Sequence, residues 1–276
     1  MPLRIVQSKQ NARLKELRQA LAHPGRESSR GGRALAGIEG PNLLDEALRA
    51  GLRVACVFAA EGAEHLLEAL KLPPETEILL MSRELLSSAL ATETPQPIAA
   101  LVEPPDWSWA HIVGAQQPGS QRNAAPLILV LASLQDPGNL GAILRSAEAF
   151  GACGVLSLPG TVSAWNPKAV RASAGSVFRL PLLAASAEDC FANLREAGVK
   201  LWTTAVSGAE PADCVNLAGP VALLIGNEGN GVPPDLAAQA DGAITIPCPG
   251  PVESLNAAVA AGVLLYEASR QRRNPR

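Results

Sequence analysis

Along residues 1–103, short apolar runs alternate with segments in which apolar residues recur every three or four positions. Leu14, Leu17 and Leu21 have the spacing of an amphipathic helix, whereas residues 98–102 form a continuous apolar run typical of a buried strand. The pattern predicts helices at residues 5–22, 41–50, 61–71 and 83–90, and strands at residues 34–39, 53–59, 77–81 and 98–102. Short strands that alternate with helices favour a compact α/β/α domain over residues 1–103.

Residues 104–126 break this alternation. Proline and glycine interrupt the segment and no apolar face is sustained along it, so we predict a linker there. Trp107 and Trp109 lie in this linker. They could stack on a nucleobase or pin the linker against a neighbouring domain, and we favour pinning.

The rest of the chain, residues 127–276, returns to the alternation and predicts a second α/β domain. Strands are predicted at residues 127–132, 154–158, 177–182, 199–205, 221–225 and 243–246, with helices between them. Asn166 followed by Pro167 is a helix N-cap with proline at the first helical position. The pattern favours a parallel sheet with helices on both faces, in which ligands bind at the carboxyl ends of the strands.

The helix predicted between Gly138 and Gly151 has two contrasting faces. One face is apolar and consists of Leu140, Ile143, Leu144, Ala147 and Phe150. At about 100° per residue, Gly141 and Arg145 lie together on the opposite face. Packing of the apolar face on the sheet therefore leaves Arg145 available for chemistry.

The segment from Ile246 to Tyr266 begins as the end of a strand and is broken by three prolines and a glycine between residues 247 and 251. We predict that a helix restarts near Ser254 and that Ser254 is its N-cap. Alanine and glycine crowd the first turns of this helix, so another backbone can approach it closely.

Three stretches that follow predicted strands carry the candidate chemistry. They are Asn139-x-Gly141-x-x-x-Arg145, Gly226-Asn-Glu228-Gly-x-Gly231 and Ile246-Pro-x-x-Gly250-x-x-x-Ser254-Leu-Asn256. Their order, spacing and flanking elements over residues 126–270 resemble the SpoU (TrmH-like) family of the SPOUT RNA methyltransferases. Cys248 stands where this family often has methionine, which is a small apolar change.

The resemblance implies a trefoil-knotted parallel sheet that binds S-adenosylmethionine in the loops after two of its strands. Gly226, Ile246 and Leu255 match the positions that contact this cofactor. The implied enzyme is an RNA methyltransferase that transfers a methyl group to a ribose 2′-hydroxyl. No metal is expected to take part.

The same resemblance makes Arg145 the central catalytic residue, and Asn139, Glu228, Ser254 and Asn256 the residues that orient it and the ribose. We interpret Arg145 as a clamp on the target phosphate and ribose, because a guanidinium with a pKa of roughly 12 or more is a poor base. Whether Arg145 or a substrate phosphate takes the hydroxyl proton is left open.

Residues 1–103 resemble the L30e-like substrate-binding domain often found ahead of SpoU catalytic domains. The matching pieces are Ile38-Glu39-Gly40 and residues 94–98, although Pro97 departs from the glycine common at that place. This domain favours 23S ribosomal RNA as the substrate. The alternatives are a tRNA 2′-O-methyltransferase and a non-catalytic RNA-binding protein that retains the fold, and the intact motif residues argue against the second.

Members of the superfamily act as homodimers, which implies a dimer here through the helices that follow Gly138 and Ser254. The formal net charge is −3, so positive charge is local rather than general. It gathers in residues 4–33 and 270–276, where arginine and lysine could contact RNA phosphates.

The five cysteines are scattered without metal-like spacing, which argues against zinc and disulfides and favours reduced thiols in a cytoplasmic protein. No apolar run is long enough to cross a bilayer, so no membrane partner is expected. His23, His65 and His111 show no nucleophile or metal pattern. A nicotinamide enzyme is disfavoured because the glycines from Gly226 to Gly231 run in the wrong order for a dinucleotide fingerprint, and no P-loop is present.

Overall fold

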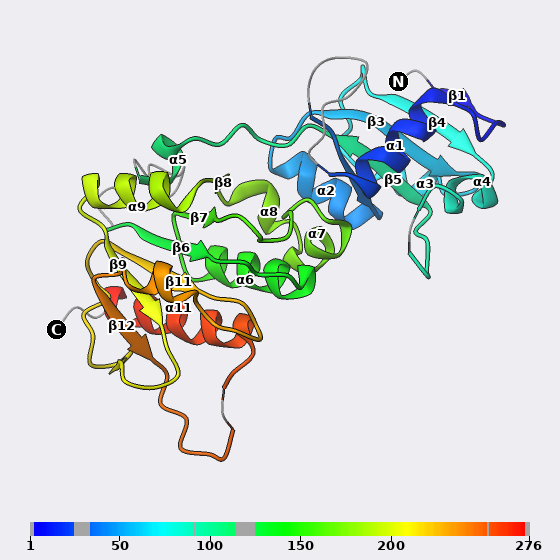
Figure 1. Ribbon diagram of the computed structural model, residues 1–276. Coiled ribbons are helices and arrows are strands. Elements are labelled where there is room, and N and C mark those ends of the chain that lie inside the picture. Colours follow the sequence, from blue (N-terminus) through cyan, green and yellow to red (C-terminus); the bar gives the residue numbers. More distant parts are fainter. Residues whose placement is uncertain (1–2, 25–33, 91, 114–124, 253, 274–276) are drawn as a thin grey trace. The chain divides into compact units, whose positions relative to one another are not determined.

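The computed structural model describes residues 3–24, 34–90, 92–113, 125–252 and 254–273 (Figure 1). Contacts divide the chain into two compact units. Unit 1 comprises Met1–Asp106 and Ser163–Arg179, and unit 2 comprises Trp107–Val162 and Leu180–Arg276. Each unit is described by itself.

Unit 1 is built on a five-stranded sheet with the order β1-β4-β3-β5-β2. Its strands are β1 (Leu3–Ile5), β2 (Ala36–Glu39), β3 (Val54–Ala60), β4 (Glu77–Met81) and β5 (Ile98–Val102). Its helices are α1 (Ala12–Ala22), α2 (Pro41–Arg49), α3 (His65–Glu68), α4 (Arg83–Ser87), α7 (Pro167–Ser173) and α8 (Ser176–Arg179). Strands β1, β4 and β3 pair in parallel, and β5 is antiparallel to β3 and β2.

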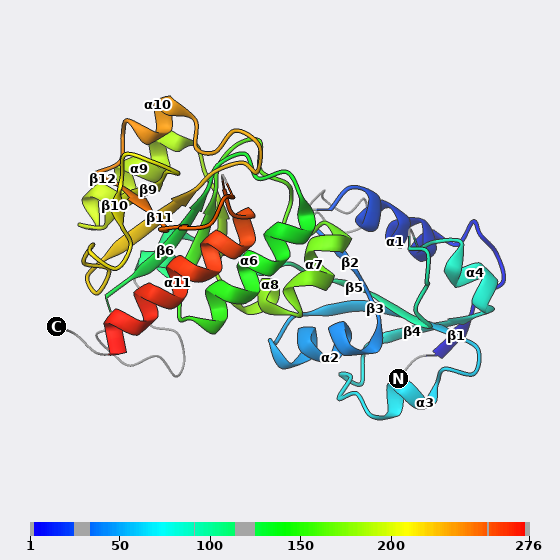
Figure 2. The same ribbon diagram turned by 90° about the horizontal axis from the view of Figure 1, so that it is seen from below.

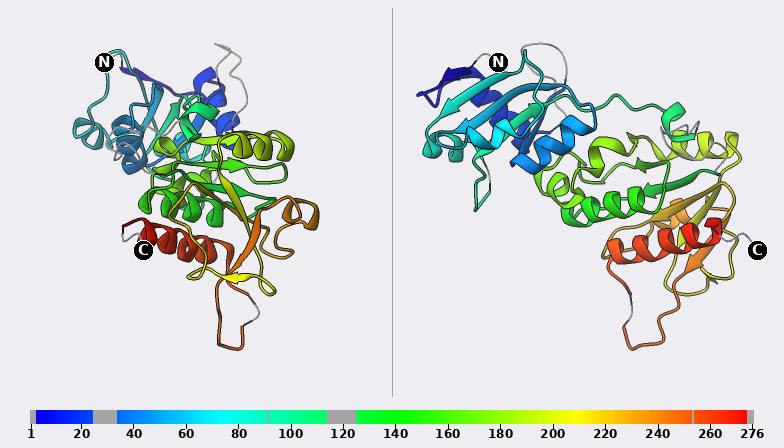
Figure 3. Two further views of the ribbon diagram at one scale, coloured as in Figure 1. Left: turned by 90° about the vertical axis from the view of Figure 1, so that its left-hand side faces the viewer. Right: turned by 180° about the vertical axis from the view of Figure 1, so that it is seen from behind.

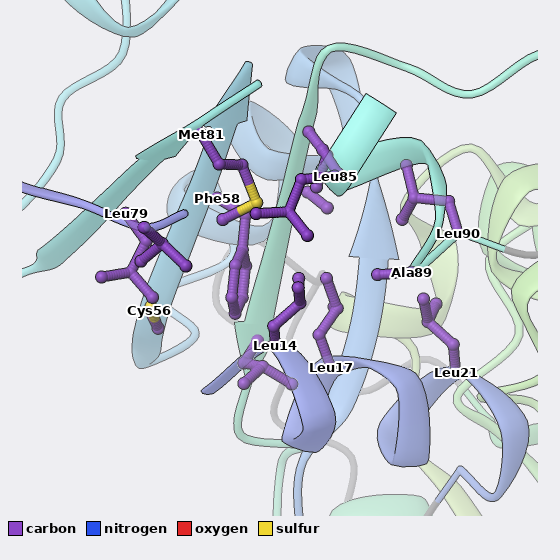
Figure 4. Packing of buried hydrophobic residues seen from close by; sticks show 14 of the residues in the cluster. Leu14, Leu17, Leu21, Cys56, Phe58, Leu79, Met81, Leu85, Ala89 and Leu90 are labelled. Carbon is purple, nitrogen blue, oxygen red and sulfur yellow. The ribbon is translucent and has the colours of Figure 1, made fainter. Parts of the chain in front are cut away.

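Helices α1 and α4 supply the apolar side chains that cover one face of this sheet (Figure 4). Leu14 and Leu17 of α1 are fully buried in one cluster with Phe58 of β3 and Met81 of β4. Helix α2 covers the opposite face (Figure 2). The α/β/α arrangement predicted for the N-terminal part is therefore present.

Three helices of unit 1, α1, α3 and α4, are clearly shorter than predicted, and α4 ends at Ser87 instead of residue 90. Helix α1 begins at Ala12 because the Asn11 side chain accepts hydrogen bonds from the amides of Arg13 and Leu14, which caps the helix there. The residues before it form the short edge strand β1. Helix α3 spans only His65–Glu68, and Gly62, with φ of 85°, turns the chain before it.

Unit 2 contains a seven-stranded sheet with the order β10-β12-β9-β11-β6-β7-β8, in which every pair is parallel. Its strands are β6 (Leu127–Leu131), β7 (Gly154–Ser157), β8 (Leu182–Ala184), β9 (Lys200–Thr204), β10 (Glu210–Pro211), β11 (Val221–Ile225) and β12 (Gly242–Thr245). Its helices are α5 (Trp109–Val113), α6 (Pro137–Ala149), α9 (Ala187–Glu196), α10 (Pro234–Ala237) and α11 (Ala257–Arg273).

Helices α6 and α11 lie side by side on one face of this sheet, and α9 packs on the other (Figure 2). All residues of the two central strands, β6 and β11, are buried. The predicted parallel sheet with helices on both faces is confirmed, and the trefoil knot stays a prediction.

The strand predicted at residues 177–182 is wrong. Ala174 and Gly175 adopt φ of 49° and 88°, which ends α7 and reverses the chain. One helical turn, α8, follows, and the strand begins only at Leu182. The short apolar run after Gly175 fits a buried helix as well as a strand, so its pattern alone could not decide between them.

Part of the predicted linker, residues 114–124, lies outside the described residues. The part before it forms helix α5, which the sequence pattern did not predict. Ile112 is fully buried, and Trp109 packs against the same apolar cluster of unit 2. The ring of Trp107 contacts that of His111 edge-on. The packing of Trp109 supports the pinning interpretation for that residue, whereas the contact of Trp107 lies within the predicted linker.

All five cysteines are thiols, and Cys56 and Cys190 are buried. Burial, followed by the nearby carboxylate of Glu77, raises the pKa of Cys56 to about 12. Burial likewise raises the pKa of Cys190 to about 12. Within the described ranges, no cluster of three or more His, Cys, Asp or Glu side chains could hold a metal ion. The helices among those residues include none that is long and apolar enough to cross a membrane.

Candidate functional site

The three motif stretches follow β6, β11 and β12, whose carboxyl ends lie at one edge of the unit 2 sheet. Strands β6 and β11 are adjacent, with Leu131 opposite Ile225, so the loops that follow them start side by side. Strand β12 lies beyond β9, and the segment after it projects from the sheet before the chain returns to α11 (Figures 1 and 3). In parallel sheets this edge is where ligands bind.

The first motif forms the start of α6. The carboxylate of Asp136 caps this helix by accepting a hydrogen bond of 2.8 Å from the Asn139 amide, and Pro137 occupies the first helical position. The cap fixes the Asn139 side chain at the edge of the sheet, where the other two motifs arrive.

A chain of hydrogen bonds joins all three motifs. Asn139 donates through Nδ2 to Oε1 of Glu228 at 2.9 Å. Asn256 donates through Nδ2 to Oδ1 of Asn139 at 3.1 Å. Asn139 therefore uses both ends of its amide, one toward the loop after β11 and one toward the start of α11.

Glu228 is held as a carboxylate by neutral donors. Its slight burial raises its pKa, but hydrogen bonds from the Asn139 side chain and from the main-chain amides of Glu228, Gln135 and Asp136 outweigh that effect, and the net result is a lowered pKa. The side chain remains exposed. A negative charge that no described cation pairs with thus faces outward at the sheet edge.

Asn256, rather than Ser254, caps α11. The Oδ1 atom of Asn256 accepts hydrogen bonds from the amides of Ala258 at 2.9 Å and Val259 at 3.3 Å. The helix therefore begins at Ala257, and the N-cap predicted at Ser254 is wrong. Ser254 is exposed in the preceding loop. The sequence offered two capping residues two positions apart, and the backbone uses the second.

Arg145 is exposed on α6, and its guanidinium makes no hydrogen bond or ion pair with any other described residue. The predicted apolar face is confirmed in that Leu140, Ile143 and Leu144 are buried. Gly141, however, is also buried, although it shares the helix row of Arg145. The second helix, α11, packs on α6, and a residue without a side chain is readily covered by such a neighbour.

Arg145 does not join the hydrogen-bonded cluster. Six residues separate it from Asn139, which corresponds to about 600° of rotation and about 9 Å along the helix. The two side chains therefore leave α6 in different directions. One copy of unit 2 presents Asn139, Glu228 and Asn256 together, and presents Arg145 elsewhere on the same helix.

The predicted cofactor positions lie on the loops after β11 and β12. Gly226 is buried where the backbone doubles back, and a Cβ atom there would lie 2.1 Å from the carbonyl carbon of Gly231, so only glycine fits. Ile246 and Leu255 are partly exposed. No described residue accepts a hydrogen bond from the amides of Ser254 and Leu255, which suits these loops to holding polar groups of a ligand through the main chain.

The sequence-based reasoning missed two features of this edge. Asn227 ties the loop after β11 to the loop after β6, since its Nδ2 atom donates to the carbonyl oxygen of Ser133 at 2.9 Å. The segment after β9 also reaches the same edge, where Val206 is 71% exposed and its carbonyl oxygen accepts from Thr245 Oγ1. The position of Asn227 between Gly226 and Glu228 was a readable signal, because Asn commonly organises such turns.

Comparison with known proteins gives two family matches. Residues 126–266 match the SpoU rRNA Methylase family, and residues 38–108 match the family described as RNA 2′-O ribose methyltransferase substrate binding. Both matches include residues singled out above. The first contains all three motifs.

Individual relatives agree with these matches. The chain is 32% identical over 233 residues to a 23S rRNA (guanosine(2553)-2′-O)-methyltransferase of Bacillus subtilis, and the match covers 83% of this chain and 86% of the relative. Its fold is similar to that of a SpoU methyltransferase from Streptomyces viridochromogenes in complex with the cofactor AdoMet, with a TM-score of 0.80, 30% identity and coverage of 97% of this chain and 100% of the other. An AdoMet-bound rRNA methyltransferase from Sinorhizobium meliloti gives a TM-score of 0.81, 28% identity and 98% coverage of both chains.

Proposed function

Because the chain belongs to the SpoU family of RNA methyltransferases, we propose that it methylates a ribose 2′-hydroxyl of 23S ribosomal RNA. The observation that carries the proposal is the hydrogen-bonded cluster of Asn139, Glu228 and Asn256, which brings the three motifs together at the ligand-binding edge of the sheet. The B. subtilis relative, named as a 23S rRNA 2′-O-methyltransferase, supports the choice of RNA.

S-adenosylmethionine supplies the methyl group, carried on a positively charged sulfur. We assign its binding to Gly226, Ile246 and Leu255, on the loops after β11 and β12. The tight turn at Gly226 and the main-chain amides of residues 254 and 255 suit contacts made by backbone atoms. The exposed carboxylate of Glu228 adds a negative charge at the same edge of the sheet.

We assign the catalytic roles to Arg145, Asn139, Glu228, Ser254 and Asn256. The ribose hydroxyl is a poor nucleophile, so most of the rate comes from positioning and from stabilising the charge that develops as its proton leaves. Arg145 clamps the target phosphate and ribose, because its planar guanidinium can grip a phosphate through two hydrogen bonds. The other four residues orient the ribose and Arg145.

The active unit is a homodimer. Members of the superfamily act as homodimers, and Arg145 leaves α6 in a different direction from Asn139, which fits a site completed by the arginine of a second copy. Helix α11 offers the contact surface, because Val259, Val263 and Tyr266 are 52%, 41% and 49% exposed at a spacing of four and three residues. The ring of Tyr266 contacts Phe150 at the end of α6, which makes the apolar stripe continuous with that helix.

The double substitution Val259→Asp and Val263→Asp tests the dimer. It should give monomers in sedimentation or light scattering at micromolar protein concentration, and it should abolish methyl transfer. Neither valine is buried, so the fold should be retained. A folded and fully active monomer would refute the shared site.

We propose that residues 1–103 bind RNA, that residues 104–126 link the two domains, and that residues 127–276 carry out catalysis. Lys9 and Lys15 are exposed before and on α1, where they can contact phosphates. Arg26, Arg30, Arg33 and Arg276, which belong to the predicted basic clusters, lie outside the described residues. The thiols and the ribosomal RNA substrate fit a cytoplasmic location.

Mapping of 2′-O-methyl groups on total RNA from cells with and without the gene tests the function. Loss of one methyl group in 23S rRNA supports the proposal. Loss of a methyl group in tRNA would favour the tRNA alternative. An unchanged pattern would favour a non-catalytic RNA-binding protein.

A further inference from the structure

Asn227 is the centre of a tightly closed turn in unit 2. Its main-chain amide and carbonyl both bond to Gly231, at 2.9 Å each. Its Oδ1 atom accepts from the amides of Gly229 at 2.8 Å and Asn230 at 3.3 Å. The Asn227 side chain therefore fixes the shape of the segment from Gly226 to Gly231, which includes Glu228.

The other end of the same amide group leaves this turn. Nδ2 donates at 2.9 Å to the carbonyl oxygen of Ser133, which lies two residues after the buried end of β6. Ser133 has φ of 56°, an uncommon conformation for serine. A strained residue of this kind persists where the surrounding contacts hold it, and the bond from Asn227 is one of those contacts.

Ser133 begins the short stretch that leads to the first motif. Asp136, three residues later, caps α6 and donates its amide to Glu228 at 3.4 Å. Asn139 donates to Glu228 at 2.9 Å. The two loops thus meet twice, once at Asn227 and once at Glu228. The contact at Asn227 uses a single carbonyl and is independent of the Glu228 carboxylate.

We propose that Asn227 is a positioning residue for methyl transfer, which holds the loop after β11 against the loop after β6 so that Glu228 meets Asn139. Asn227 does not touch the ribose or the phosphate. It acts through Glu228, so this inference rests on the role proposed for Glu228. The side chain is partly exposed rather than part of the apolar core.

Two substitutions separate the two functions of the amide group. Asn227→Asp retains an oxygen that can accept from the Gly229 and Asn230 amides, so the turn is preserved, but it removes the donor to Ser133. Asn227→Ala removes both. Asn230→Ala is the matched control, because Asn230 is exposed in the same turn and contributes its main-chain amide to it.

The measurements are single-turnover methylation of the mapped RNA and calorimetric titration with S-adenosylmethionine. Asn227→Asp should lower the single-turnover rate by about 10-fold or more, as expected for loss of one positioning hydrogen bond, with cofactor affinity little changed. Asn230→Ala should behave as wild type. A wild-type rate in the Asp variant, or an equal loss in the Asn230 control, would overturn the proposal.

The pH–rate profile adds a readout that a purely structural residue would not move. In Asn227→Ala, which places no new charge beside Glu228, loss of the turn and of the bond to Ser133 removes donors that keep the pKa of Glu228 low, so the acid limb of the profile should move to higher pH. An unmoved acid limb counts against positioning. Glu228→Gln separates failure of the Asn227 proposal from failure of the role proposed for Glu228. If Glu228→Gln leaves methylation intact, the role proposed for Glu228 is wrong, whatever the Asn227 variants show.

Discussion

Glu77 of unit 1 and Glu228 of unit 2 differ in their partners, because Glu77 lies against two arginines whereas Glu228 accepts hydrogen bonds from neutral groups. In unit 1, Glu77 pairs with Arg13 at 3.3 Å and with Arg4 at 3.4 Å, and Glu16 pairs with Arg13 at 2.8 Å. In the described part of unit 2, the donors to Glu228 are neutral side-chain and main-chain groups.

This difference is the one expected between charges that stabilise a fold and a charge that serves the proposed function. The arginines of the unit 1 cluster cancel its carboxylates, and an outside ligand gains little from such a site. The donors around Glu228 fix its direction and favour its ionised form without cancelling the charge. Such a group remains able to interact with a cation or a hydroxyl that enters the site.

Substitution of Arg145 is expected to have the largest effect on methyl transfer. Arg145 is an exposed cation of unit 2 that no described carboxylate pairs with. Arg145→Ala should lower methyl transfer by about 10²–10³-fold, as is typical for loss of one preorganised charge-stabilising group. Cofactor affinity and stability should be nearly unchanged, because the side chain is exposed and lies outside the loops assigned to the cofactor. Single-turnover methylation beside calorimetric cofactor titration measures both.

Arg145→Lys is the matched control for charge. It should rescue little, because an ammonium cannot reproduce a planar, bidentate grip on phosphate. A near wild-type rate in the alanine variant, or outright loss of cofactor binding, would show that Arg145 is wrongly assigned.

The direct test of the comparison changes one carboxylate in each unit. Glu228→Gln should lower methylation about 10-fold or more while the free energy of unfolding stays close to that of wild type. Glu77→Gln should leave methylation intact and cost about 1 kcal/mol of stability, because it leaves Arg13 and Arg4 with weaker partners. Denaturant melts and methylation assays of both variants suffice. If the two substitutions change methylation and stability to the same extent, Glu228 and Glu77 do not differ in the way proposed.

Substitution of the exposed lysines of unit 1 is expected to have a smaller effect, and this effect is on RNA affinity. Lys9→Glu and Lys15→Glu should each weaken RNA binding several-fold at low salt. Each should also flatten the dependence of log affinity on log salt by about 0.7–0.9 for every phosphate that the lysine neutralises in the wild-type complex. Lys200→Glu is the control, since Lys200 is exposed in unit 2 and the change in net charge is identical. The proposal for residues 1–103 fails if all three variants bind RNA alike.

Much of the site could be predicted because its residues follow buried strands. The apolar runs of β6 and β11 were readable as strands, and parallel strands bring their following loops to one edge. That β6 and β11 are neighbours, so that Asn139 meets Glu228, is known only from the structure. The cap of α11 could not be read in the same way. Ser254 and Asn256 are both good caps, and the choice depends on where the loop joins α6 through Asn139.

Local pattern failed where tertiary contacts decide. Strand β1 has three residues, all exposed, and exists because Leu3–Ile5 pair with β4, whose residues Ile78, Leu79 and Leu80 lie far away in the sequence. The run that includes Phe178 became a helical turn because Ala174 and Gly175 reverse the chain before it. The pairing of β1 is not encoded in a window of a few residues, whereas after the local turn at Ala174 and Gly175 the apolar run alone did not distinguish a helical turn from a strand.

The smallest effect is expected on the pH dependence of stability, to which the two buried thiols contribute. Cys56 and Cys190 both have a pKa raised to about 12, but burial is the only cause at Cys190, whereas Glu77 also contributes at Cys56. A folded-state pKa above the ordinary value of 9.0 contributes stability that is complete below pH 9 and is lost as pH rises toward 12. Stability should therefore fall between these pH values as both thiols ionise on unfolding.

Glu77→Gln sharpens this comparison, because it removes a negative charge that opposes ionisation of Cys56 only. The pKa of Cys56 should move down toward 9 while that of Cys190 stays in place. Ultraviolet absorbance of the thiolate, titrated from about pH 8 to about pH 11 in variants that retain Cys56 or Cys190 as their only cysteine, measures this difference. If the titration of Cys190 moves as much as that of Cys56, the variant has loosened the whole fold, and the local influence of Glu77 is disproved.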